Sequence, residues 1–486
     1  MNLGDSLNYS GSDRIALIDL SNDQTRAYTY NDLDQAIQGV ATRIAAEKDQ
    51  RIGLLGANSA EFVTTLFAIM RSGAVAVPMN TKFPDETLHF VAQDANLYSA
   101  YIDRAEDGRL PESLHVEPLL SLELDKQASY LSHTPELGDA GMVLYTSGST
   151  GRPKGVLLSH DSQWAMVSRM KELLAQATGI IAAPLYHMNG LLFLMSLFAG
   201  RGTVVLMPRF SARQYLQAIH DHRVNVITGV PTMLTLMLKE ADLIESLDLS
   251  SVVAIQVGSA PLSETLIEQV QTKFPNARIS NGYGTTEAGA GMFGAHPDRL
   301  PVPSLALGYP QAHVEVRLVG GASQDEGVLE VKTPAAMSGY LNLPEKTAEK
   351  MSDDGWINTG DIMRRDERGF YYFVGRDDDM FNCGGENIYP GEVERILEQD
   401  SRIAECCVVP VPDEVKGQKP VAFVVLAEGR EMQDEDVKAV ALAQAPAYMH
   451  PREVYFLATM PLAGTNKIDR HALATLAAER TSSDRD

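Results

Sequence analysis

Apolar segments of strand length alternate with helical segments through much of the chain, and this alternation restricts the fold more than any other feature. Residues 51–80 predict a buried strand, an amphipathic helix that ends at Gly73, and a second buried strand. The pattern returns at 224–229 and 252–257, with a helix beginning near Pro231 between them. Buried strands that alternate with helices are typical of parallel sheets covered by helices, so we expect an α/β fold.

Later segments follow a different pattern. Short alternating runs between 314 and 331, joined by Gly-Gly and Asp-Glu-Gly, predict a small antiparallel β subdomain. Helical patterns at 391–399 and 435–444, with strand patterns at 406–411 and 420–426, predict a compact α+β unit near the C-terminus.

The chain of 486 residues is too long for one compact core, so we expect at least two domains. A polar run at 375–379 lies between a predicted strand and the last α+β unit. We therefore predict a large N-terminal domain at 1–375 and a small C-terminal domain at 376–486.

Composition limits the partners and the compartment. The chain has 41 Lys and Arg residues against 64 Asp and Glu, a formal net charge of −23, which argues against nucleic acid and anionic membranes. Its three cysteines form neither a disulfide framework nor a zinc spacing, which favours a reducing, cytoplasmic location. The most apolar stretch, 179–200, is interrupted by Pro184, His187 and Asn189, so we expect no membrane span.

One segment, YTSGSTGRPKG at 145–155, combines glycines, small hydroxylated residues and two cations. Glycine lets the backbone approach a ligand closely, and successive N–H groups can form a concave anion site. Short apolar runs on both sides predict buried strands, so a flexible linker is the weaker interpretation. The segment is not a Walker A loop, because its lysine is followed by glycine. It predicts a polyphosphate-binding loop with candidate residues Thr146, Ser147, Gly148, Ser149, Thr150, Gly151 and Lys154.

This segment resembles the phosphate-binding loop of the adenylate-forming superfamily, which includes acyl-CoA synthetases, peptide-synthetase adenylation domains and firefly-type luciferases. Four further motifs match that superfamily in the same order along the chain. The whole chain most resembles the compact bacterial aryl and medium-chain acyl-CoA synthetases.

The second motif, NGYGTTE at 281–287, resembles the superfamily's adenine-and-magnesium motif. Tyr283 could stack on a purine, a contact worth roughly 1–3 kcal/mol, and Glu287 could hold Mg²⁺. Either residue alone would more often be structural. The nucleotide-binding residues that the resemblance implies here are Gly258, Ser259, Ala260, Pro261, Asn281, Gly282, Tyr283, Gly284, Thr285 and Thr286.

The remaining motifs lie toward the C-terminus. In WINTGD, the carboxylate of Asp361 suits two ribose hydroxyls, and the resemblance adds Arg376 to this role. By itself Asp361 would more often stabilise a turn. The Gly384-Gly385 pair resembles the loop that borders the pantetheine tunnel of CoA. The last motif resembles the one that carries the adenylation lysine, here Lys467, although Asn466 replaces the usual glycine.

The resemblance implies two half-reactions. A carboxylate attacks the α-phosphorus of ATP to give acyl-AMP and pyrophosphate, and the thiol of CoA then displaces AMP. It also implies a small C-terminal domain that rotates between the two steps, with Asp377 at the hinge. The implied catalytic residues are Lys467, Glu287, Thr146 and His187, and the implied cofactors and co-substrates are ATP, Mg²⁺ bound by Glu287, and CoA.

The acyl pocket is predicted from PLYHMNG at 184–190, where His187 takes the place of the gating aromatic residue. A buried, satisfied histidine is the alternative. This motif has no aspartate for an amino acid's ammonium group, and Gly282 offers no arginine for a dicarboxylate. Small or apolar residues therefore predict an aryl, phenylpropenoic or medium-to-long-chain acid. The proposed pocket residues are His187, Met188, Val230, Gly282, Gly284 and Gly289.

Other functions compete with a CoA ligase. The chain could load the phosphopantetheine of a carrier protein, which uses the same chemistry. A luciferase-like oxygenase has no positive feature in its favour, and a catalytically dead binding protein conflicts with the intact motifs. The sequence does not decide between a monomer and a homodimer.

Overall fold

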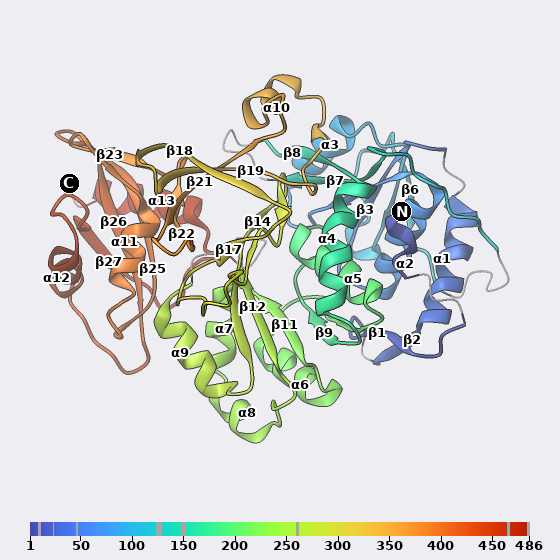
Figure 1. The fold of residues 1–486 in the computed structure, drawn as a ribbon, viewed down its shortest axis with the longest axis horizontal. Helices are drawn as coiled ribbons and strands as arrows, with labels where there is room; N and C mark the ends of the chain where they lie inside the picture. The colour runs from blue at the N-terminus through green and yellow to red at the C-terminus, as the bar shows by residue number, and fades with distance from the viewer. Residues whose placement is uncertain are drawn as a thin grey trace.

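The structure is a computed structural model that describes residues 1–7, 11–22, 24–44, 47–122, 129–146, 152–258, 262–463 and 467–483. Figure 1 shows the C-terminal strands at one side of the molecule and the N-terminal sheets with their helices at the other. Strands and amphipathic helices alternate as the sequence predicts, and the α/β fold class is confirmed.

One large sheet has the strand order β20-β8-β7-β4-β3-β5-β6. Strands β3 to β7 run parallel along this order, whereas β8 and β20 are antiparallel to their neighbours. The bounds are β3 Arg51–Leu55, β4 Val75–Met79, β5 Ser99–Ile102, β6 His115–Pro118, β7 Ala140–Thr146, β8 Lys154–Ser159 and β20 Gly339–Tyr340.

A second large sheet has the order β13-β12-β11-β9-β10-β1-β2, and only its edge strand β2 pairs antiparallel among the described residues. The bounds are β1 Ile15–Asp19, β2 Arg26–Thr29, β9 Thr178–Ile181, β10 Thr203–Leu206, β11 Val226–Gly229, β12 Ala254–Gly258 and β13 Arg278–Gly282.

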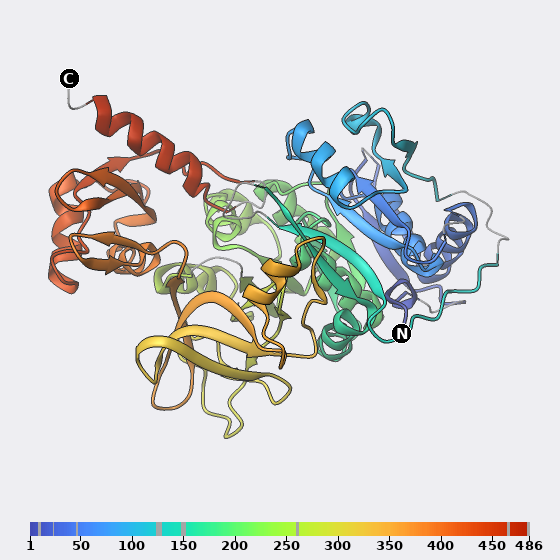
Figure 2. The ribbon, with the colours of Figure 1, turned by 90° about the horizontal axis from the view of Figure 1, so that it is seen from above.

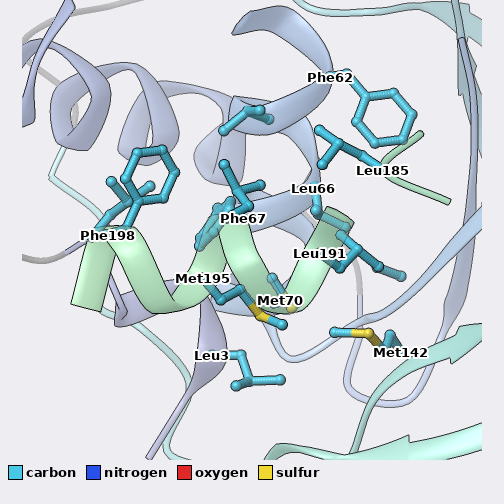
Figure 3. Close-up of a cluster of buried hydrophobic side chains, with 14 of the residues drawn as sticks. Leu3, Phe62, Leu66, Phe67, Met70, Met142, Leu185, Leu191, Met195 and Phe198 are labelled. Carbon is cyan, nitrogen blue, oxygen red and sulfur yellow. The ribbon is translucent and has the colours of Figure 1, made fainter. Parts of the chain in front are cut away.

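Side chains of helices α2 and α5 pack together (Figure 3). Both large sheets contribute side chains to the same core. The rings of Phe67 on α2 and Phe198 on α5 meet edge to face, with centroids 5.8 Å apart. The helix bounds in this region are η1 Leu3–Asp5, α1 Tyr30–Ile44, α2 Ala60–Ser72, α3 Asp85–Asp94, η2 Arg104–Glu106, α4 His160–Leu173, α5 Met188–Ala199, α6 Ala212–His222, α7 Pro231–Leu238, α8 Ala241–Ser246 and α9 Glu264–Lys273.

Helix α2 shows how local sequence sets the boundaries. The Ser59 side chain accepts a hydrogen bond from the Phe62 N–H at the start of the helix, and Gly73 ends the helix with φ of 86°. A positive φ at the end of a helix favours glycine. The predicted end of the helix at Gly73 is therefore confirmed.

Strands β18, β19, β21 and β22 form the predicted antiparallel sheet, which β14 to β17 connect to the second large sheet. Helix α10 follows β20 and lies against β21. The bounds are β14 Gly284–Thr285, β15 Gly289–Ala290, β16 Phe293–Gly294, β17 Tyr309–Pro310, β18 Glu315–Ser323, β19 Glu326–Lys332, α10 Pro344–Lys350, β21 Ile357–Arg365 and β22 Tyr371–Arg376.

The C-terminal part is a sheet of order β24-β23-β26-β25, with β27 parallel to β26 and helices packed against it. Figure 2 shows its last helix, α13, in red, running outward from the middle of the molecule to the C-terminus. The bounds are β23 Phe381–Cys383, β24 Glu386–Ile388, α11 Pro390–Leu397, β25 Ile403–Asp413, β26 Gly417–Leu426, α12 Asp434–Gln444, β27 Glu453–Phe456 and α13 Arg470–Ser483. Within the described residues, no helix is long and apolar enough to cross a membrane.

Candidate functional site

The candidate nucleotide residues follow the carboxyl ends of parallel strands. Thr146 ends β7, Gly258 ends β12 and Gly282 ends β13. Ligands of open α/β sheets bind in the crevice outside these strand ends. The topology therefore brings motifs from distant parts of the sequence to one region of the molecule.

The predicted phosphate loop connects two paired strands. Thr146 lies opposite Lys154 across the antiparallel pair β7–β8. The Lys154 ammonium lies over the ring of Tyr340, with Nζ 4.8 Å from the ring centroid. The other candidates in the loop, Ser147, Gly148, Ser149, Thr150 and Gly151, lie outside the described residues, as do Ser259, Ala260 and Pro261 of the GSAP segment.

Tyr283 and Asp361, which the sequence predicts for adenine and ribose, form a hydrogen bond in the structure. The Tyr283 hydroxyl donates to Asp361 Oδ2 at 2.5 Å, and Arg376 Nη1 lies 3.5 Å from Asp361 Oδ1. Asp361 is buried, and burial raises the pKa of its carboxyl although Tyr283, Arg376 and Lys350 act in the opposite direction. The pair leaves an aromatic face and a carboxylate side by side, which suits a nucleoside.

Arg376 connects this carboxylate to the proposed hinge. Its guanidinium donates to both oxygens of Asp378, at 2.7 and 3.0 Å, and this contact is the main cause of its raised pKa. The N–H of Asp377 donates to the carbonyl of Gly360 at 2.8 Å. The predicted hinge residue therefore adjoins the loop that carries Asp361.

Glu287 is held by a residue that the sequence motifs do not include. The Tyr340 hydroxyl donates to Glu287 Oε1 at 2.8 Å, and the Glu287 carbonyl accepts from the Met337 N–H at 2.8 Å. In the described part of the chain, no group of three or more His, Cys, Asp or Glu side chains is arranged so that it could hold a metal ion. One oriented carboxylate still fits Mg²⁺, which commonly uses one or two carboxylates together with substrate phosphates.

Lys467 lies among these groups. It lies within a small hairpin, in which Leu462 pairs with Ile468 and the Ala463 N–H donates to the Lys467 carbonyl at 2.8 Å. Burial is the main cause of the lowered pKa of the Lys467 ammonium, and the charge of Arg376 lowers it further. The Asp361 carboxylate acts in the opposite direction. The structure thus brings the predicted adenylation lysine within electrostatic range of the predicted ribose carboxylate.

His187 precedes α5 and lies in the same region. Its Nε2 atom is buried and has no hydrogen-bond partner among the described residues. Burial lowers the pKa of its imidazole to about 4, with a smaller effect from Lys467, so the ring is neutral at neutral pH. A buried ring nitrogen without a partner argues against the satisfied core histidine that was the alternative. Met188, which follows His187 in the sequence, and Val230 are both buried.

The glycines proposed for the acyl pocket have a structural use. A Cβ on Gly284 would lie 2.5 Å from the Gly289 carbonyl oxygen, and one on Gly289 would lie 2.6 Å from the Ala335 Cβ. A Cβ on Gly282 would lie 2.8 Å from Gln256 Nε2. At these positions the missing side chain permits close packing, and the apolar character of the site comes from its neighbours.

The structure does not bring Gly384 and Gly385 to this group of residues. They join β23 to β24 with φ of 64° and 96°, and the Gly384 N–H donates to the Lys416 carbonyl within the C-terminal sheet. Figure 1 shows β23 at the outer side of the C-terminal part, away from β14. In this arrangement Lys467, and not the glycine pair, faces the candidate nucleotide site.

Two residues of the site belong to none of the sequence motifs. Tyr340 lies far from Glu287 in the sequence, and Lys350 lies on a helix without a recognisable motif. Lys350 Nζ donates to the Thr359 carbonyl at 2.9 Å, next to the Asp361 loop. No local pattern marks either residue, because each acquires its neighbours only through tertiary pairing.

Comparisons with known proteins agree with this geometry. The AMP-binding enzyme family model matches residues 6–341, and the AMP-binding enzyme C-terminal domain model matches 392–467. A feruloyl-CoA synthase of Amycolatopsis sp is 32% identical over 459 residues, which cover 91% of this chain and 92% of the relative. The fatty acid–[acyl-carrier-protein] ligase ScoC of Streptomyces coeruleorubidus is 31% identical, over 92% of this chain and 91% of the relative.

Among solved structures, o-succinylbenzoate CoA synthetase (MenE) from Bacillus subtilis, in complex with the acyl-adenylate intermediate OSB-AMP, has a TM-score of 0.81. It is 27% identical and covers 97% of each chain. The fold and the site define an AMP-binding, adenylate-forming enzyme. The chain belongs to the adenylate-forming superfamily, in its acyl-CoA synthetase branch.

Proposed function

We propose that this chain is an ATP-dependent acyl-CoA ligase that works through an acyl-AMP intermediate. The observation that carries the proposal is the position of Lys467, which lies within electrostatic range of Asp361, Arg376 and His187. A lysine there can meet both the nucleotide and an acid substrate. Membership in the acyl-CoA synthetase branch supports the same reaction.

In the first half-reaction a carboxylate oxygen of the acid bonds to the α-phosphorus of ATP. The bond from that phosphorus to its bridging oxygen breaks, and pyrophosphate leaves with the electron pair. Lys467 lowers the repulsion between the two anions by placing its charge between them. Preorganised charge of this kind is worth several kcal/mol in the transition state.

Other residues of the site hold the nucleotide. Asp361, oriented by Tyr283 and Arg376, accepts hydrogen bonds from the ribose hydroxyls, while Thr146 and Lys154 face the phosphates. Glu287, oriented by Tyr340, would bind Mg²⁺, which supplies positive charge to the pyrophosphate when bound. The enzyme needs no covalent intermediate of its own, because AMP is the activating group.

In the second half-reaction the thiol sulfur of CoA bonds to the acyl carbonyl carbon, and AMP leaves with the electrons of the broken C–O bond. We infer that the Gly384-Gly385 hairpin replaces Lys467 at the site for this step. The hairpin projects from the same C-terminal sheet, and Asp377 lies where the chain enters that part. As part of the same mechanism, we propose that the boundary between the N-terminal and C-terminal domains lies at 375–376.

We propose an aryl or phenylpropenoic acid as the leading substrate class, with medium-to-long aliphatic acids next. The neutral ring of His187, with its buried Nε2 atom, next to the buried Met188 offers one polar contact in apolar surroundings, which suits an acid with an aromatic body better than one with a second charged group. The likeness to the feruloyl-CoA synthase of Amycolatopsis sp supports this choice.

The test is to incubate the purified protein with ATP, Mg²⁺ and a panel of these acids, with and without CoA, and to identify products by mass spectrometry. We expect acyl-CoA and AMP only in the complete reaction, and acyl-AMP when CoA is left out. Acyl-AMP that persists in the presence of CoA would contradict the CoA ligase assignment.

The alternative is an acyl-AMP ligase that loads the phosphopantetheine of a carrier protein. The likeness to the acyl-carrier-protein ligase ScoC supports it, and the site chemistry is shared. Adding a phosphopantetheinylated carrier protein to the same assay separates the two, because only this alternative predicts transfer to the carrier and none to CoA.

A further inference from the structure

Lys350 places a positive charge between Asp361, proposed for the ribose, and Glu287, proposed for Mg²⁺ beside the pyrophosphate. It is the last residue of α10, which follows β20, and its Nζ donates to the Thr359 carbonyl at 2.9 Å. A Cβ built on Gly360 would lie 3.8 Å from Lys350 Nζ and 3.6 Å from Arg376 Nη2. The ammonium therefore lies directly beside the loop that carries Asp361.

The ammonium is within electrostatic range of groups assigned to different parts of ATP. Glu287, on the proposed metal and pyrophosphate side, and Asp361, on the ribose side, both favour its charged form. Arg376 and Lys154 oppose it, and burial is the largest influence, lowering its pKa. Between a ribose and a pyrophosphate lies the α-phosphate.

Two other cations near the site, Arg376 and Lys154, already have partners. Arg376 donates twice to Asp378, and Lys154 lies over the Tyr340 ring. An ammonium has three donors, and in the described part of the chain Lys350 has only the Thr359 carbonyl as an acceptor. A partly buried cation with unused donors is costly unless an anion completes its surroundings.

We propose that Lys350 binds the α-phosphate of the nucleotide, in ATP and again in the acyl adenylate. This assignment rests on the proposed function, and it adds a residue that none of the superfamily's motifs in this sequence includes. Lys350 precedes the proposed hinge at Asp377, whereas Lys467 follows it. Lys350 therefore stays with the adenylate when the C-terminal part moves, so it contributes to both half-reactions.

Three substitutions separate a charge contact from a structural anchor. Lys350→Gln keeps a donor for the Thr359 carbonyl but removes the charge, Lys350→Met removes both, and Lys350→Arg keeps the charge. Lys346→Gln is the matched control, because it makes the same charge change on the same helix, where Lys346 forms an exposed ion pair with Glu349.

The experiment titrates AMP, and ATP with Mg²⁺, into each variant by calorimetry and measures the KM for supplied acyl-AMP in thioester formation. Loss of one charged hydrogen bond predicts roughly tenfold to hundredfold weaker AMP binding for the Gln and Met variants. The acyl-AMP KM should rise in parallel, the Arg variant should recover most of the affinity, and the Lys346 control should match the wild type.

Two results would overturn the assignment. One is wild-type AMP affinity in both the Gln and Met variants. The other is wild-type affinity in the Gln variant with a loss in the Met variant, which would make Lys350 an anchor for the Thr359 loop. If the wild-type protein itself binds neither AMP nor ATP, the proposed function fails, and the inference fails with it for that separate reason.

Discussion

The hydrogen bond between Tyr283 and Asp361 joins two residues for which the sequence predicts separate tasks. Stacking on adenine needs only the tyrosine ring, but the hydroxyl also donates to Asp361, the proposed ribose carboxylate. We expect Tyr283→Phe to raise the KM for ATP by about tenfold, because a hydrogen bond to a charged group contributes about 1.5–3 kcal/mol. Tyr283→Ala should raise it further, because the stacking is also lost. Steady-state kinetics checks this, and equal KM values for the Phe variant and the wild type would contradict it.

The lowered pKa of Lys467 predicts a pH dependence. Adenylation needs the charged ammonium, so the rate should fall as pH rises through the pKa of Lys467. Burial and Arg376 hold that pKa below the ordinary value of 10.5, so the fall begins at lower pH than for an exposed lysine. ATP–pyrophosphate exchange from about pH 6 to 10 measures it. Lys467→Arg, if active, should move the alkaline limb to higher pH, and an unmoved limb would assign the titration to another group.

At the scale of elements, the start of α13 is fixed by an ion pair three residues after Lys467. Arg470 donates to both carboxylate oxygens of Glu394 on α11, at 2.7 and 2.6 Å, and to the Val408 carbonyl at 3.1 Å. Glu394 is buried, and its Oε1 also accepts from the Val408 N–H. The pair therefore ties α11, β25 and the Lys467 hairpin into one unit.

We expect Arg470→Lys to slow acyl-AMP formation more than thioester formation from supplied acyl-AMP. A lysine keeps the charge but cannot make the bidentate contact, and a small displacement of a catalytic group can cost up to about 100-fold in rate. Arg402→Lys is the matched control, because it makes the same change at another bidentate pair of the C-terminal part, in which Arg402 donates to both oxygens of Asp400. Equal losses in both half-reactions, or a similar loss in the control, would mean that the pair only stabilises the domain.

Local patterns predict most elements but not the contacts between them. The helix ending at Gly73 and the strands β18 and β19 follow from periodicity and turn residues, because both signals are local. Tyr340 and Lys350 reach the site only because β20 pairs with β8 and α10 lies against β21. No spacing in the sequence records such pairing, so these two residues were missed.

At the scale of the whole molecule, the sequence predicts the chemistry of the site better than its arrangement. It assigns Lys467 and the Gly384-Gly385 pair to one reaction, and the structure places Lys467 at the site with the glycines on the outside of the C-terminal sheet. We propose that this arrangement serves the first half-reaction and that a different one serves the second. We propose that the C-terminal part rotates about the peptide at Asp377 between the two arrangements.

We expect Asp377→Pro to retain acyl-AMP formation and to lose most thioester formation. Proline fixes φ and so restricts rotation at this peptide. It also removes the N–H that donates to the Gly360 carbonyl, so adenylation should fall slightly, by about the contribution of one hydrogen bond, 1 kcal/mol. Single-turnover measurement of each half-reaction checks this. Normal thioester turnover in this variant would contradict the assignment of Asp377 as the hinge residue.

The proposed mechanism requires that Lys467 serves the first half-reaction alone. The decisive measurement compares the wild type with Lys467→Ala in two assays: acyl-AMP formation from acid and ATP, and thioester formation from supplied acyl-AMP and CoA. We predict that the variant loses acyl-AMP formation by at least about 100-fold, as expected for removed preorganised charge, and keeps thioester formation near the wild-type rate. Equal loss in both assays, or no loss in the first, would contradict the account.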